Sequence, residues 1–68
     1  MLKTLLQDKV EDGLSIADIR YRVEAVTGIQ LADQTVRNHL GGSRASTEAL
    51  KGYKGAFGWS YDEMIEGE

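Results

Sequence analysis

The chain has 68 residues, of which 41% are hydrophobic and 28% charged, and its formal net charge is −3 at pH 7. This length accommodates one globular domain, and the absence of cysteine excludes disulfides, thiolate chemistry and cysteine-bound metal clusters. The apolar runs are too short to span a membrane, and residues 1–8 lack the apolar core of a signal peptide. These features favour a cytoplasmic protein.

Apolar residues at helical spacing predict a first helix near the N-terminus and a second helix over about residues 15–27. The first stripe consists of Leu2, Leu5, Leu6 and Val10, and the second of Ile16, Ile19, Val23 and Val26. Ser15 followed by Asp18 is a capping signal for the second helix, and Gly28 supplies the backbone freedom that ends it.

The third predicted helix, about residues 33–40, has a polar surface of unusual composition. Val36 and Leu40 share its apolar face, whereas the other side carries Gln34, Thr35, Arg37 and Asn38. Surface helices more often carry Glu and Lys, while these four side chains have donors and acceptors that match base edges and phosphates. Ala32 at its start cannot accept a capping hydrogen bond, and Asp33 places a negative charge there.

A fourth and a fifth helix are predicted in the last third of the chain. Ser46 or Thr47 caps the fourth, and Ser60 with Glu63 forms a capping box for the short fifth. The fourth helix contains Leu50, Tyr53 and Phe57, and Met64 and Ile65 lie on one side of the fifth. Tyr53, Phe57 and Trp59 are expected in the core. Gly52 and Gly55 inside the fourth helix predict a close contact with a neighbouring helix.

The charges are unevenly distributed along the chain. Residues 20–54 contain Arg20, Arg22, Arg37, Arg44, Lys51 and Lys54 against Glu24, Asp33 and Glu48, whereas residues 55–68 contain acidic charges only. One face can therefore be positive although the whole molecule is negative. The alternative is that these charges only solvate the surface.

Residues 35–42, Thr-Val-Arg-Asn-His-Leu-Gly-Gly, resemble the recognition helix and following turn of the lambda-repressor-like helix-turn-helix proteins, the Cro/cI/Xre group. Residues 46–50 and 56–67 are similar to the last two helices of that family, so the resemblance covers most of residues 14–67. It implies an all-α fold, a compact bundle of about five short helices, and a single DNA-binding domain over residues 1–68. The second helix and the turn before Thr35 are both longer than the family's pattern.

The resemblance also implies which side chains contact DNA. With the third helix in the major groove, base contacts would come from Gln34, Thr35, Arg37 and Asn38. Phosphate contacts would come from Ser43, Arg44 and Arg20, and from Lys51 and Lys54 if these two face the duplex. A dimer patch near the C-terminus would consist of Trp59, Tyr61, Met64 and Ile65.

The function expected from these residues is that of a Cro-like repressor from a phage, prophage or other mobile element. It would bind a two-fold symmetric operator in double-stranded DNA as a homodimer, associated with the nucleoid in the cytoplasm. The alternative is a protein-interaction module, such as an antirepressor, with weak or no DNA binding; the acidic balance and Asp33 favour it. We expect no enzyme activity, metal or cofactor, and partial core packing for His39, the only histidine.

Overall fold

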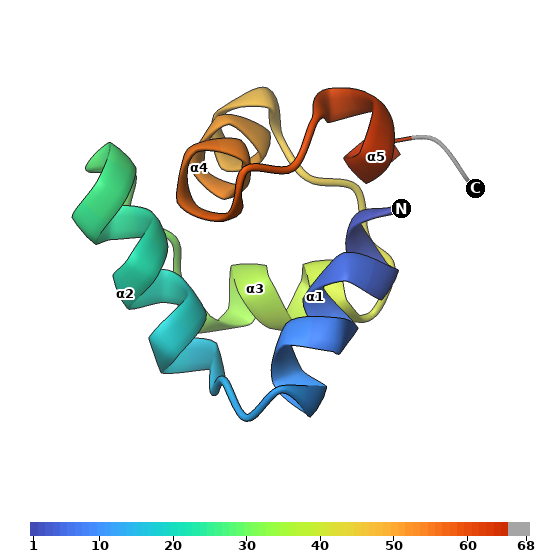
Figure 1. Ribbon diagram of the computed structural model, residues 1–68, viewed down its shortest axis with the longest axis horizontal. Coiled ribbons are helices and arrows are strands. Elements are labelled where there is room, and N and C mark those ends of the chain that lie inside the picture. The colour runs from blue at the N-terminus through green and yellow to red at the C-terminus, as the bar shows by residue number, and fades with distance from the viewer. Residues whose placement is uncertain (66–68) are drawn as a thin grey trace.

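The computed structural model describes residues 1–65, and these residues form five α-helices and no strand. The helices are α1 (Leu2–Glu11), α2 (Ile16–Thr27), α3 (Asp33–Leu40), α4 (Thr47–Phe57) and α5 (Tyr61–Ile65) (Figure 1). The all-α prediction is confirmed, as are the expected positions of the second and third helices. Within the described residues no helix is long and apolar enough to cross a membrane.

The helix ends follow the capping residues of the sequence. Ser15 and Asp18 form the predicted capping box, in which the Ser15 backbone amide donates to the Asp18 carboxylate at 2.9 Å. Hydrogen bonding with Ser15 lowers the pKa of Asp18. Ser46 is the cap of α4, since its hydroxyl accepts from the Ala49 amide at 3.2 Å. Ala32 gives α3 no side-chain cap, as predicted.

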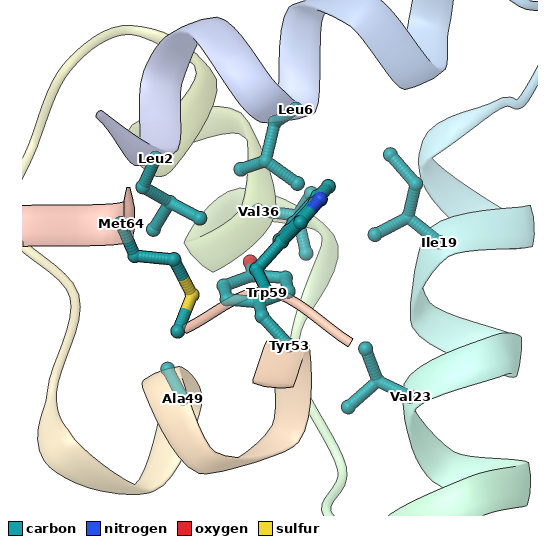
Figure 2. Packing of buried hydrophobic residues seen from close by; sticks show 9 residues of the cluster. All are labelled: Leu2, Leu6, Ile19, Val23, Val36, Ala49, Tyr53, Trp59 and Met64. Carbon is teal, nitrogen blue, oxygen red and sulfur yellow. The ribbon is translucent and has the colours of Figure 1, made fainter. Parts of the chain in front are cut away.

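The core lies where side chains from all five helices meet. Its buried members are Leu2, Leu6, Ile19, Val23, Val36, Ala49, Tyr53, Trp59 and Met64 (Figure 2). Trp59, in the connection between α4 and α5, lies 6.4 Å from the Tyr53 ring, centroid to centroid. Each fully buried large side chain contributes about 1.5–3 kcal/mol to folding.

This core corrects the predicted dimer patch. Trp59 is 9% exposed and Met64 2% exposed, so both face the interior and neither is available to a second chain. The reason is that α5 packs against α1 and α4, which buries Met64. Trp59, in the connection before α5, packs against Tyr53 in the core. Tyr61 and Ile65 remain accessible, at 36% and 51% exposure.

The helices α2 and α4 approach each other closely because α4 carries two glycines on the contact face. A Cβ added at Gly52 would lie 2.7 Å from Val23 Cγ1, and one at Gly55 would collide with Thr27 Cγ2. The predicted close helix contact is therefore confirmed. Val26, expected in the apolar stripe, is 59% exposed instead, because Val23 and Thr27 are the α2 residues that meet α4.

Candidate nucleic-acid interface

The helix α3 has one face in the core and one face in solvent. Val36 is fully buried and His39 is 4% exposed, whereas Gln34, Arg37 and Asn38 are exposed on the other side. Thr35 is half-buried at the edge between the two faces. Three of the four predicted base-contacting residues thus share one surface, and the fourth borders it.

Gln34 and Asn38 lie side by side on this exposed face. The Gln34 Nε2 amide donates to Asn38 Oδ1 at 3.0 Å. This bond leaves the Gln34 carbonyl and the Asn38 amide nitrogen free to accept and to donate, and Arg37 adds a forked set of donors. With its side chains an α-helix is about 10–12 Å in diameter, which fits the width of the DNA major groove. The arrangement can therefore present mixed donors and acceptors to base edges.

The buried face of α3 is fixed to α4 by a polar contact. His39 Nδ1 lies 2.7 Å from the Tyr53 hydroxyl, and the two rings meet edge to face at 5.6 Å between centroids. Burial lowers the pKa of His39 and raises the pKa of Tyr53, so both side chains are neutral near pH 7. The expected core packing of His39 is confirmed, and its nearly complete burial anchors the helix that carries the polar face.

Arg20 has a different role from the predicted phosphate contact. Its Nε donates to the Leu31 carbonyl at 2.6 Å, and its Nη1 forms an ion pair with Asp33 Oδ1 at 2.6 Å. The guanidinium therefore joins α2 to the turn of residues 28–32 and to the first residue of α3. Because the charge of Arg20 opposes that of Asp33, the negative charge at the start of α3 is partly neutralised.

The loop after α3 places Ser43 and Arg44 beside the end of the exposed face. Both residues are exposed, and the Ser43 amide donates to the Asn38 carbonyl at 2.9 Å, which fixes the start of the loop. Lys3 of α1 reaches the same loop, since its Cδ lies 3.5 Å from the place of a Cβ on Gly42. Sequence reasoning missed Lys3, because only the packing of α1 against α3 brings these distant segments together.

Lys54 of α4 belongs to another part of the surface. Lys51 and Lys54 are both exposed, and the Lys54 ammonium lies 5.0 Å above the ring of Tyr61. Lys54 therefore contacts α5. The structure thus groups Gln34, Arg37 and Asn38 with Ser43 and Arg44, and it leaves Lys54 outside this group.

No family model, curated protein or solved structure matches this chain significantly. Among residues 1–65, no group of three or more His, Asp or Glu side chains is placed to hold a metal ion.

Proposed function

We propose that this chain is a sequence-specific DNA-binding transcriptional regulator that reads the major groove with α3. The observation that carries the proposal is the paired arrangement of Gln34 and Asn38 on an exposed helix face. The opposite face of that helix is fixed in the core by Val36 and His39. A reading helix needs this combination, because its side chains discriminate between bases only when the backbone is held at a defined depth.

The flanking residues support the proposal through their charges. Arg37 on the exposed face and Arg44 in the following loop are exposed cations that take part in no ion pair within residues 1–65. Ser43 and Arg44 would bind the phosphates beside the groove that α3 enters, and Arg37 would reach a guanine or a phosphate. Arg20 keeps the Asp33 carboxylate from repelling the DNA backbone at the other end of the helix.

We propose that the regulator is a Cro-like repressor from a phage, prophage or other mobile element, because most of residues 14–67 resemble the lambda-repressor-like proteins. One copy of so small a module makes few contacts, so we propose a homodimer on a two-fold operator whose half-sites lie about 34 Å apart or a multiple of it. Tyr61 and Ile65 are the accessible apolar residues near the C-terminus that such a dimer would use.

Selection of bound duplexes from a random pool tests this function. The expected result is a palindromic motif, whose half-site spacing also reports the symmetry of the complex. In the same selection, Asn38→Ala should show a weaker base preference at particular positions within each half-site of the motif. A matched control is Gln7→Ala, which removes an exposed amide from α1. If the parent protein enriches no motif, or if Asn38→Ala enriches the same motif, α3 is not a sequence reader.

A second candidate function is that of a protein-interaction module without DNA binding. The observation that favours it is the exposure of two large apolar side chains of α2, since Tyr21 is 74% exposed and Val26 is 59% exposed. A salt titration with random-sequence DNA separates the two functions, because attraction to phosphate underlies sequence-independent binding by DNA readers. Measurable binding at low salt that weakens as salt rises supports the DNA reader, and no binding at low salt supports the interaction module.

A further inference from the structure

A groove lies between the first turn of α1, the loop after α3 and the helix α5. Figure 1 shows the start of α1 close to α5 and to this loop. The groove has a volume of about 300 Å³, at the lower end of the range for small-molecule sites. Its apolar lining includes Leu2, Leu50, Met64 and Ile65.

The polar lining of the groove is cationic. Lys3, Ser43 and Arg44 are among the residues that line it, and none of the lining residues within the described range 1–65 is acidic. Lys3 and Arg44 also take part in no ion pair among residues 1–65. An apolar floor next to two cations is chemically complementary to a molecule with an anionic head and an apolar body.

We propose that this groove binds a small amphipathic anion, such as a medium-chain carboxylate. Its head would lie between Lys3 and Arg44, and its chain would lie against Leu50 and Ile65. A consequence that rests on the proposed function is competition with DNA, because Ser43 and Arg44 are also the proposed phosphate contacts. The binding of the anion itself does not depend on DNA recognition.

Titration with octanoate tests the proposal, and the fluorescence of Trp59 reports it. Trp59 is the only tryptophan of the chain and shares the core cluster with Met64. The expected result is a saturable change with one octanoate bound per chain. Octylammonium, which has the same chain and the opposite charge, should bind at least about tenfold more weakly.

Two sets of variants place the anion in the groove. Lys3→Gln combined with Arg44→Gln should weaken octanoate binding at least about tenfold. Lys51→Gln combined with Lys54→Gln removes the same charge outside the groove and should leave binding unchanged. The exposed groove residue Ile65 gives a second test, since Ile65→Gln should also weaken binding without disturbing the core. Thermal melting curves confirm that each variant is folded.

Several outcomes would overturn the proposal. These are the absence of a saturable signal, equal binding of octylammonium, and octanoate binding unchanged by the Lys3 and Arg44 substitutions. Sedimentation of the free protein supplies another, because a dimer that forms without DNA and that Ile65→Gln dissociates would assign the groove to a contact between two copies, whereas the dimer proposed above forms on the operator. Failure of octanoate binding leaves DNA selection by the parent protein intact, so the two proposals fail separately.

Discussion

Arg20 Nη1 lies 2.6 Å from Asp33 Oδ1, and this ion pair connects the second helix to the first residue of the third. The same guanidinium donates from Nε to the Leu31 carbonyl within the intervening turn. One side chain thus holds three consecutive segments of the chain. Its two contacts set the direction in which α3 leaves the turn, and they place a positive charge next to the only acidic residue of α3.

Replacement of Arg20 by Met should lower the free energy of unfolding by about 1–2 kcal/mol. An exposed ion pair contributes up to about 1 kcal/mol, and the lost bond to the Leu31 carbonyl contributes about as much again. Urea denaturation measures this change. The affinity for random-sequence DNA should also fall, because the unpaired Asp33 then repels phosphate.

The substitution Asp33→Asn distinguishes this account from a direct phosphate contact by Arg20. If Arg20 acts by neutralising Asp33, Asp33→Asn in the Arg20→Met background restores a large part of the DNA affinity. If Arg20 contacts phosphate, the double variant binds as weakly as Arg20→Met. The slope of the logarithm of the binding constant against the logarithm of the salt concentration then becomes less steep by about one.

Gly55→Ala should destabilise the protein by about 1–3 kcal/mol, because the added methyl group collides with Thr27 Cγ2 and two hydrogen bonds of the Thr27 hydroxyl hold that side chain in place. Thr27→Ser removes that methyl group and keeps the hydroxyl, which donates to the Val23 carbonyl at 2.7 Å. The double variant should therefore be more stable than the sum of the single effects predicts, as a double-mutant cycle in urea would show. Gly41→Ala is the matched control, since its Cβ would make ordinary contacts only. A cost for Gly41→Ala equal to that for Gly55→Ala would contradict the steric explanation.

Features that depend on local periodicity were predictable from the sequence. The spacing of Val36 and Leu40 predicted which side of the third helix is buried, and the polar side chains between them followed on the other face. Ser15 and Asp18 predicted a helix start in the same way, because a capping box is formed by residues three apart.

Features that depend on tertiary packing were not predictable from the sequence. The pairing of Arg20 with Asp33 needs the turn between α2 and α3 to place residues 13 positions apart within bonding distance. Lys3 reaches the loop at Gly42 only because α1 packs against α3. Trp59 was expected both in the core and in a dimer patch. It is buried in the core, because α5 packs against α1 and α4.

The stability of the protein should fall as the pH is lowered from about 7.5 to about 5.5, because of His39. Burial holds the pKa of His39 below its ordinary value of 6.5 in the folded protein. Below that ordinary value the unfolded chain binds a proton that the folded protein does not, so the free energy of unfolding decreases as the pH falls. Melting temperatures over this pH range measure the effect. His39→Gln removes the only histidine and should abolish the change in melting temperature between pH 7.5 and pH 5.5. A change in melting temperature that persists in this variant would assign the effect to another group.

Arg44→Ala should weaken binding to all DNA sequences by a similar factor. A phosphate contact carries no sequence information, so the selected motif should stay the same while the salt dependence of binding falls by about one unit of slope. Binding isotherms at several salt concentrations, with the operator and with a scrambled duplex, measure both quantities. Lys54→Ala is the control, since it removes an exposed cation that lies over the Tyr61 ring of α5. A change in the preferred sequence would identify Arg44 as a base contact instead.

Gln34→Ala and Asn38→Ala should each reduce discrimination between the operator and a mismatched duplex by about 1–3 kcal/mol, provided that each amide binds its base bidentately. Their effects should not be additive, because the two amides are hydrogen-bonded to each other in the free protein at 3.0 Å. The Gln34–Asn38 hydrogen bond must break before both amides can bind bases, and breaking it costs free energy. Either single substitution already removes that bond, so the remaining amide binds its base without this cost. Competition binding with operator and mismatched duplexes measures the two single variants and the double variant. Additive losses would mean that the amide pair is already broken in free solution, and unchanged discrimination in both single variants would remove α3 as the reader.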